Sequence, residues 1–467
     1  MVRILPRSSP SLQGVDASGI LAFVDALEAA SGVEMHSMML LRHGTVIAEG
    51  WWSPYSADRP QLLYSLSKSF ASTALGLAIA EGLVDLDDTV LSHFPELNSD
   101  ITDPRSRSIL VRHVAAMASG HREDTFDLAD ANDPADLLRG FLLIPPDEAP
   151  GSIFAYNQPC TFAIAAIIQN AAGMSLTDFL RPRLFDPLGI GEVGWLADGR
   201  GRELGFSGFY AQTEAIAKLG ELYLRGGRWA GQQLLSADWV AEATRSHVAT
   251  AHQDLVDWRQ GYGFHFWMSQ HGYRGDGANG QFCLVLPEQD AVLAITGQSP
   301  DMQAVLSAAW EHLLPALAFR PSDAFAAAAS SLALADIALK RRLEVASLAP
   351  AAGSPVIGDS RTYTAGGWNQ CATLTEVTVH PSPAGVVVSL IDDGYPIRFI
   401  LGIGQWVVTD VLAASGGTSD TGPLRIDLIL LETPHRLQIL CTGETFTALW
   451  VTEPLHSLPL AQMRMPH

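Results

Sequence analysis

The chain has 467 residues and a formal net charge of −21, with 48% hydrophobic and 17% charged residues. This composition is typical of a globular protein of two or three domains and excludes a largely disordered chain. The negative charge disfavours nucleic acid and anionic membrane surfaces as partners, because both would repel an acidic protein.

The four cysteines are scattered without C-x-x-C spacing: Cys160, Cys283, Cys371 and Cys441. We expect small buried residues there, with neither a zinc site nor a disulfide framework. No motif calls for a metal or another cofactor. The first ten residues lack the apolar core of a signal peptide, and no window is long enough to span a membrane, so the sequence predicts a cytoplasmic protein.

Hydrophobic periodicity predicts an α+β arrangement in the first two thirds of the chain. The predicted order is a helix, two strands, a helical insert, three strands and a helix, so both ends of this segment contribute to one sheet. The predicted helices are 17–31 (capped by Asp16), 71–80, 109–117, 161–172, 211–224, 237–245 and 301–317. The predicted strands are 38–41, 46–51, 264–268, 281–286 and 291–295. Residues 121–150 are polar and acidic, and we expect them to frame a cleft at the surface.

The composition changes after residue 318. Residues 319–358 are rich in Ala, Ser and Pro, which predicts a linker with one helix over 332–343. From residue 359 to 467, short apolar runs alternate with Gly, Pro and Asp, which predicts a separate all-β domain, a sandwich or barrel. The predicted strands there are 374–379, 386–391, 399–403, 426–431 and 436–441.

The first candidate site is a Ser-x-x-Lys pair, Ser65 and Lys68, at the start of the apolar helix 71–80. Three residues are close to one helical turn, so the two side chains share a face. A serine hydroxyl needs a neighbour to remove its proton, and a buried lysine with a lowered pKa can do that. The alternative is a helix cap followed by a solvated lysine.

Two further stretches could complete a site. Tyr156 precedes the predicted helix 161–172, and a nearby lysine charge would favour its phenolate and a role as proton shuttle. Its alternative is a packing tyrosine. The run Gly275-Asp276-Gly277 lies directly before the predicted strand 281–286, where glycines would let a substrate lie against the backbone. A hairpin turn without a ligand is equally compatible with this run.

In this order and spacing, Ser65-Leu66-Ser67-Lys68, Tyr156-Asn157-Gln158 and Gly275-Asp276-Gly277 resemble the serine β-lactamase-related hydrolases, the group of class C β-lactamases, penicillin-binding proteins and carboxylesterases. The resemblance covers about 15–318 and implies a β-lactamase/transpeptidase-like domain over 1–318, an antiparallel sheet flanked by helices. It implies that Ser65 is the nucleophile and that Lys68 and Tyr156 move protons. The N–H groups of Ser65 and Ala278 would form the oxyanion hole.

The sequence departs from that family at two positions. Asn is usual at the third place of the tyrosine motif, where this chain has Gln158 after Asn157. Lys-Thr-Gly is usual where this chain has Gly275-Asp276-Gly277. Gly275 lacks the charge that holds a substrate carboxylate, and we expect Asp276 to repel one. By strand alternation, Arg274 should face away from the side of Gly275.

These observations predict a metal-independent serine hydrolase that cleaves a small ester, amide or peptide through an acyl-enzyme on Ser65. We expect Ala278, Gly277, Asp276, Gln158 and Asn157 to contribute to the oxyanion hole or to substrate binding. The alternatives are a D-amino-acid peptidase, a weak β-lactamase, or a penicillin-binding-like sensor without turnover. Assembly into a homo-oligomer is compatible with the sequence. His121, His265 and His271 lie near the motifs, but we expect them to be structural or exposed.

Overall fold

The central element of the fold is a six-stranded antiparallel sheet. The computed structural model describes residues 5–318, 325–354, 356, 358–382, 385–418, 422–456 and 458–466. In spatial order the strands are β2 (Thr45–Trp51), β1 (Met35–Arg42), β11 (Ala291–Gly297), β10 (Gln281–Leu286), β9 (Tyr273–Gly277) and β8 (Trp267–Met268). Because β1 pairs with β11, the two ends of the hydrolase-like segment form one sheet, as the sequence predicts.

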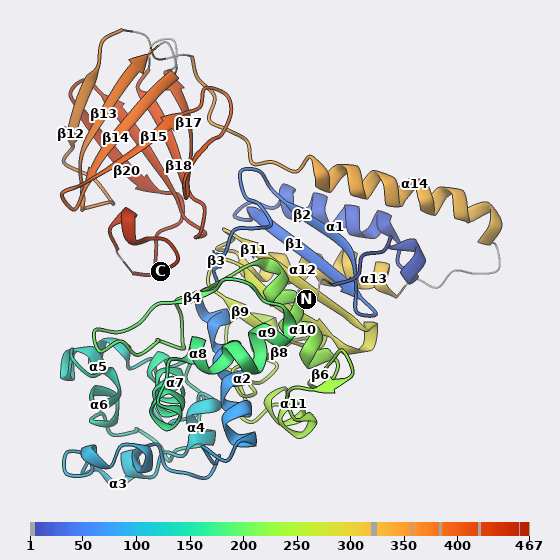
Figure 1. Ribbon diagram of the computed structural model, residues 1–467, viewed down its shortest axis with the longest axis vertical. Helices are drawn as coiled ribbons and strands as arrows, with labels where there is room; N and C mark the ends of the chain where they lie inside the picture. The colour runs from blue at the N-terminus through green and yellow to red at the C-terminus, as the bar shows by residue number, and fades with distance from the viewer. Residues whose placement is uncertain are drawn as a thin grey trace.

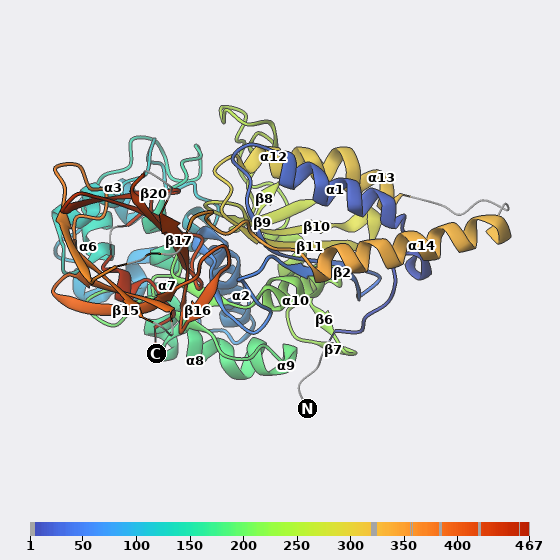
Figure 2. The ribbon, with the colours of Figure 1, turned by 90° about the horizontal axis from the view of Figure 1, so that it is seen from above.

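Strand alternation gives the sheet two apolar faces, each covered by helices (Figure 2). On β1, Met38 and Leu40 point to one core, whereas Met39 and Leu41 point to the other. The first core is covered by α1 (Ala17–Ala29), α12 (Met302–Ala308), α13 (Leu314–Leu317) and α14 (Phe325–Glu344). The second is covered by α10 (Thr213–Leu224) and α2 (Ser67–Ala80).

A helical region lies beside this sheet and contains the predicted cleft-framing segment. Its other helices are α3 (Pro104–Arg107), α4 (Val111–Ala115), α5 (Phe126–Asn132), α6 (Leu137–Leu142), α7 (Gln158–Ala172), α8 (Leu176–Leu180), α9 (Asp186–Leu188) and α11 (Ala237–Ala243). Its small sheets contain β3 (Gln61–Leu62), β5 (Phe209–Ala211) and β4 (Gly194–Trp195), and β6 (Arg228–Trp229) with β7 (Gln232–Gln233). α2 is almost wholly buried, so its first turn is held rigidly by packing.

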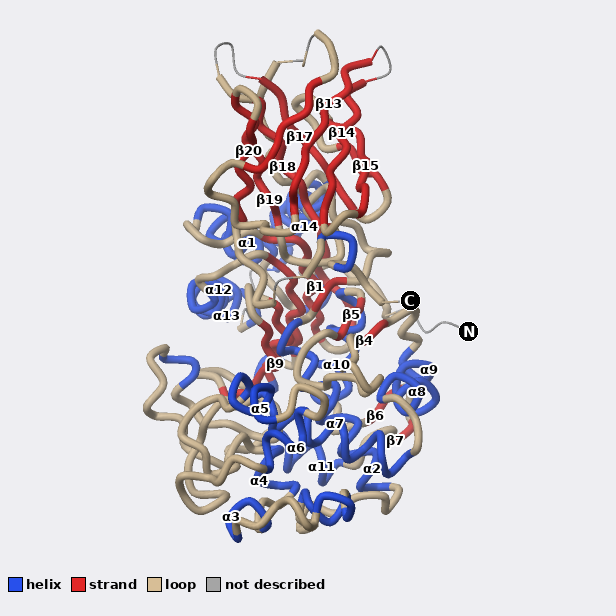
Figure 3. Tube along the Cα trace, turned by 90° about the vertical axis from the view of Figure 1, so that its left-hand side faces the viewer, coloured by secondary structure: helices blue, strands red, loops and turns tan. Residues whose placement is uncertain are grey.

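The C-terminal part of the chain is a nine-stranded, nearly closed barrel (Figures 1 and 3). In spatial order the strands are β15 (Tyr395–Leu401), β14 (Gly385–Asp392), β13 (Leu374–Ser382), β12 (Arg361–Ala365), β20 (Thr445–Trp450), β19 (Arg436–Thr442), β18 (Leu424–Leu430), β17 (Leu412–Thr418) and β16 (Val407–Thr409). The sheet nearly closes where Gly402, directly after the end strand β15, donates its N–H to the Ala414 carbonyl of β17 (3.2 Å), the strand beside the other end. The sequence prediction of an all-β domain is thus confirmed, although it misses β12, β16, β17 and β20.

The barrel is hydrogen-bonded to the segment that precedes Ser65. The Leu62 N–H donates to the Glu432 carbonyl (2.8 Å). The Tyr64 hydroxyl lies 2.5 Å from Nε2 of the fully buried His435, and the Nδ1–H of His435 donates to the Thr452 carbonyl (3.1 Å). Because Nδ1 carries the proton, Nε2 accepts a hydrogen bond from the Tyr64 hydroxyl. Burial lowers the pKa of His435 to about 4. A neutral imidazole therefore joins the barrel to the residue next to Ser65.

Removing this contact with Tyr64→Phe should lower the free energy of unfolding by about 1–3 kcal/mol, because the buried Nε2 of His435 would lose its partner. Urea denaturation measures the change. The control is Tyr395→Phe at an exposed position, which should stay within about 0.5 kcal/mol of the wild type. Equal unfolding free energies for the two variants would contradict a stabilising barrel contact.

Three predicted elements differ in the structure. Of the predicted strand 264–268 only β8 forms, because the Phe264 N–H and carbonyl bond to Ala243 and to the Ser72 hydroxyl, and His265 has a positive φ of 60°. The predicted helix 301–317 is interrupted by a π-helical segment, Ala309–Leu313. The run Gly275-Asp276-Gly277 belongs to a strand, β9, and is not merely the turn before one.

α14 contains the predicted linker helix 332–343 and packs on α1 and β2 through buried Leu339 and Leu343. Within the described ranges, no single helix is long and apolar enough to cross a membrane. One pair, Gln158–Ala172 with Leu176–Leu188, reaches that length and composition only when taken together, across a 69° bend.

Candidate active site

Ser65 lies in a short 3₁₀ turn, Tyr64–Leu66, that leads directly into α2. Tyr64 has a positive φ of 47°, an uncommon conformation for a non-glycine residue. Lys68 is one turn further on, and its Nζ is 3.0 Å from the Ser65 Oγ. The structure thus brings the predicted Ser-x-x-Lys pair into direct contact, and this geometry excludes the solvated lysine that the sequence left as an alternative.

Lys68 is 1% exposed, and its ammonium group has three oxygen partners. Nζ donates to the Ser65 Oγ, to the Gln158 Oε1 (2.7 Å) and to the Phe206 carbonyl (2.8 Å). Burial lowers the pKa of Lys68 to about 7, against the opposing charges of Asp124 and Asp276. At neutral pH a large fraction of Lys68 is therefore uncharged and able to accept a proton.

Tyr156 lies on the other side of this pair. Its hydroxyl lies beside that of Ser65, and its ring centroid is 4.8 Å from the Lys68 Nζ. The ring stacks on Trp267 with centroids 5.6 Å apart. Burial, assisted by the Asp276 charge, raises the pKa of Tyr156 above its ordinary value. The sequence analysis expected a phenolate at Tyr156, and this expectation was wrong. The Tyr156 side chain is a neutral phenol, which can donate a proton.

The two residues that follow Tyr156 point in different directions. The Gln158 amide oxygen accepts from Lys68. The Asn157 side chain is fully buried, and its Oδ1 accepts from the backbone N–H (3.1 Å) and hydroxyl (3.0 Å) of Thr125. Gln158 therefore lies at the Ser65–Lys68 pair. Asn157, which the sequence analysis also assigned to the site, does not line the cavity and instead ties the cleft-framing segment to the start of α7.

Asp124 is a site residue that the sequence analysis missed. Its Oδ1 accepts from the N–H groups of Gln158 and Phe126, each at 3.1 Å, and its charge acts on Lys68. Partial burial raises the pKa of the Asp124 carboxyl. Nothing in the local sequence separates Asp124 from its neighbours Glu123 and Asp127, because its role depends on the position of α7.

The strand β9 runs close to the turn that carries Ser65. A Cβ on Gly277 would collide with the Leu63 carbonyl oxygen, and one on Gly275 would collide with the Ser69 hydroxyl and lie 2.5 Å from the Leu66 Cδ1. Within the described part of the chain, the N–H groups of Ser65 and Ala278 donate to no backbone carbonyl. The short distance between β9 and the turn that carries Ser65 is compatible with the predicted oxyanion hole, formed by those two N–H groups. The same short distance leaves no room for a lysine side chain at position 275.

Gly275→Ala should therefore destabilise the protein by roughly 1–3 kcal/mol, the usual cost of overpacking a tight contact. Urea denaturation would measure the change in unfolding free energy. Gly191→Ala is the matched control, because an added Cβ there would meet nothing within 4 Å. If the two variants were equally stable, β9 would not be as close to α2 as the structure places it.

Asp276 has a partner that the sequence analysis did not assign to it. The Arg274 Nε donates to the Asp276 Oδ2 (2.9 Å), and the Arg274 side chain is fully buried. The two residues share a face of β9, opposite to that of Gly275, as strand alternation predicts. The pair is neutral overall, so Arg274 offsets the repulsion of a substrate carboxylate that the sequence analysis expected from Asp276.

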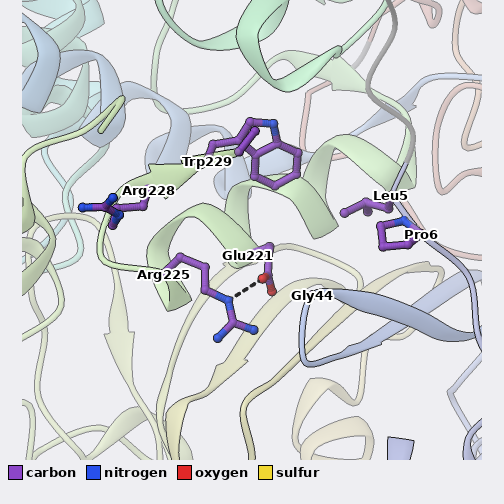
Figure 4. A pocket seen from close by; sticks show the side chains of 8 residues that line it. Leu5, Pro6, Gly44, Glu221, Arg225, Arg228 and Trp229 are labelled. Carbon is purple, nitrogen blue, oxygen red and sulfur yellow. Dashed lines mark hydrogen bonds and ion pairs between the residues drawn. The ribbon is translucent and has the colours of Figure 1, made fainter. Parts of the chain in front are cut away.

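A cavity of ≈ 280 Å³ opens at the nucleophile. Its walls are Ser65, Asp124, Phe126, Asp127, Gln158, Phe206, Ser207, Leu455 and His456. Leu455 and His456 follow the last barrel strand, so the C-terminal part of the chain forms one wall. A separate hollow of ≈ 320 Å³ around the Arg225–Glu221 ion pair shares no lining residue with this cavity (Figure 4).

Two of the histidines near the motifs are buried, and neither lines the cavity at Ser65. His265 is buried, and its pKa is lowered to about 3 by burial and by the nearby Lys68. His121 bonds to the Ser119 hydroxyl and the Ile144 carbonyl. Among the described residues, no three His, Cys, Asp or Glu side chains are placed to hold a metal ion.

Comparison with known proteins agrees with this fold. The 6-aminohexanoate-dimer hydrolase of Paenarthrobacter ureafaciens is 25% identical over 288 residues, which cover 57% of this chain and 73% of that protein. A penicillin-binding protein homolog from Caulobacter crescentus has a TM-score of 0.52 at 16% identity, covering 65% of this chain and 99% of its own. EstCE1, a hydrolase with promiscuous acyltransferase activity, has a TM-score of 0.52 at 18% identity, covering 63% and 98%. The beta-lactamase family model matches residues 22–317, and the chain therefore belongs to the beta-lactamase family.

Proposed function

We propose that the protein is a serine hydrolase that cleaves an ester or amide through an acyl-enzyme on Ser65. The observation that carries this proposal is the buried Lys68, whose Nζ is 3.0 Å from the Ser65 Oγ and whose pKa is lowered to about 7. A partly neutral amine in contact with a hydroxyl is the arrangement that a serine nucleophile requires.

In the proposed reaction, neutral Lys68 takes the Ser65 proton while Oγ attacks the carbonyl carbon of the substrate. The oxyanion that forms is held by the N–H groups of Ser65 and Ala278. Tyr156 gives its proton to the leaving oxygen or nitrogen, which departs as an alcohol or amine, and the Tyr156 oxygen regains a proton from the Lys68 ammonium. Water then attacks the acyl-enzyme, and the same groups return the proton to Ser65 and release the acid.

The charge of the cavity favours a class of substrate. Asp124 and Asp127 lie on its walls, whereas Lys68 is hidden behind Ser65 and Arg274 is paired with Asp276. A neutral or cationic ester or amide is therefore a better substrate than one with a carboxylate beside the scissile bond. The relatives are named as a hydrolase of a 6-aminohexanoate dimer and as a hydrolase with promiscuous acyltransferase activity, and neither name specifies a carboxylate beside the scissile bond.

The test is intact-protein mass spectrometry combined with steady-state turnover, using p-nitrophenyl butyrate and, separately, benzylpenicillin. We expect steady turnover of the ester, an adduct of the mass of a butyryl group on the peptide that contains Ser65, and slow or no reaction with penicillin. Because the proposed steps use protein groups only, EDTA should leave the rate unchanged. Rapid penicillin turnover would identify a β-lactamase instead. A stable adduct without turnover would indicate a sensor, and the absence of both turnover and an adduct with either reagent would overturn the proposal.

A further inference from the structure

A second, larger cavity lies beside the nucleophile, between the helical region and the end of the chain. It has a volume of ≈ 690 Å³ and shares Phe126, Phe206 and His456 with the cavity at Ser65. Its remaining walls come from α5 and α6, from the 196–204 segment, and from Leu458 to Pro466. In Figure 1 the C-terminal segment descends from the barrel toward the region of α5 and α6. The two cavities therefore adjoin, and both have walls from the C-terminal segment.

The inner surface of this cavity is mainly apolar. Its apolar wall residues are Phe126, Pro134, Ala135, Leu137, Leu196, Ala197, Leu204, Phe206, Leu458, Met465 and Pro466. Charged groups on its walls are Asp130, Asp198 and Arg464, and Arg464 is already paired with Asp410 (3.0 Å). Leu455 and Leu458 remain exposed, at 59% and 36% of their surface. Large exposed leucines beside an apolar cavity are typical of a surface that a ligand covers.

The wall formed by the C-terminal segment is held in place by the barrel. The Met465 N–H donates to the Glu432 carboxylate (2.7 Å), and the Leu460 N–H donates to the Asp392 carboxylate (2.6 Å). Both acceptors are largely buried. Because charge-assisted bonds of this kind are strong, the cavity has a preformed shape and does not depend on a loosely attached tail.

We propose that this cavity binds an extended apolar arm of the substrate, so that the C-terminal domain selects substrates by the length of that arm. This inference rests on the proposed function, because the arm is attached to the bond that Ser65 attacks. The two cavities share wall residues and therefore lie side by side, so that one extended molecule can reach from Ser65 into the larger cavity. Burial of an alkyl chain against these walls removes apolar surface from water, which favours longer substrates in kcat/KM.

Two ester series test the proposal. p-Nitrophenyl esters from acetate to decanoate vary the acyl arm, and acetate esters from butyl to decyl alcohol vary the other arm. We expect kcat/KM to rise at least about tenfold along one series, since several methylenes are buried. Leu458→Trp, which fills the cavity, should remove most of that rise and leave the shortest ester within about twofold of the wild type.

Leu334→Trp is the matched control, because Leu334 is exposed on α14 and does not line either cavity. Should Leu458→Trp fail to fold, Ala197→Trp narrows the cavity from a different segment of its wall. Turnover that is independent of chain length in both series, or a length preference that survives both cavity-filling variants, would overturn this inference alone. Failure of every ester to react at Ser65 would instead overturn the proposed function.

Discussion

Ser65→Ala is expected to lower kcat/KM for p-nitrophenyl butyrate by at least about 10⁴-fold, the effect of removing a nucleophile from a unit of interacting catalytic groups. The variant has no Oγ to form the acyl bond, whereas Lys68 and Tyr156 remain. Any residual rate would come from water held near the oxyanion hole. Initial rates measured with the purified variant, together with intact mass after incubation with the ester, give both the loss of rate and the loss of the adduct.

This loss has to be separated from a loss of fold. Ser65 is only partly buried, and the substitution removes a single oxygen, so circular dichroism and the urea midpoint should stay close to those of the wild type. Ser99→Ala, at an exposed position, should keep full activity. If the Ser65 variant kept more than about 1% of the wild-type rate, hydrolysis would proceed through a different nucleophile or through direct attack by water.

The parts of the site that the sequence predicted are those with a local signal. Ser65 and Lys68 are one helical turn apart, so their contact follows from backbone geometry. Gln158 faces Lys68 because α7 starts where the tyrosine motif ends, and Arg274 and Asp276 share a face because strands alternate. The apolar runs 38–41, 282–286 and 291–295 identify β1, β10 and β11, and the shorter run 46–48 identifies β2.

Other parts depend on contacts between distant segments, and local patterns do not encode them. Asp124 acts on Lys68 only because α7 brings Gln158 to it. The Phe206 carbonyl accepts a hydrogen bond from Lys68. Because this acceptor is a backbone group, no side chain in the sequence indicates it. The neutral state of Tyr156 depends on its burial, since the Lys68 charge alone would favour the phenolate. The contact from Tyr64 to His435 spans 371 positions in the chain.

The pH dependence of the reaction follows from the lowered pKa of Lys68. The uncharged amine is the form that can accept the Ser65 proton, so kcat/KM should rise with pH and level off above a pKa of about 7. Below that pKa each pH unit should lower the rate by about tenfold, because the neutral fraction falls by that factor. A lysine in water would place this limb near its ordinary pKa, several units higher, so the position of the limb reports the burial of Lys68.

Lys68→Met should remove both most of the activity and the rise of kcat/KM with pH. We expect kcat/KM to fall by about 10²–10⁴-fold, the usual contribution of a general base, and the residual rate to lack the rise near pH 7. The matched control is Lys218→Met, since Lys218 is also buried and its Nζ donates to the Gly189 carbonyl (2.9 Å), and it lines neither cavity. That variant should keep the wild-type profile even where it lowers stability. If the limb near pH 7 persisted in Lys68→Met, the titrating base would be another group on the cavity wall, and Asp124, whose pKa is raised by burial, is the candidate.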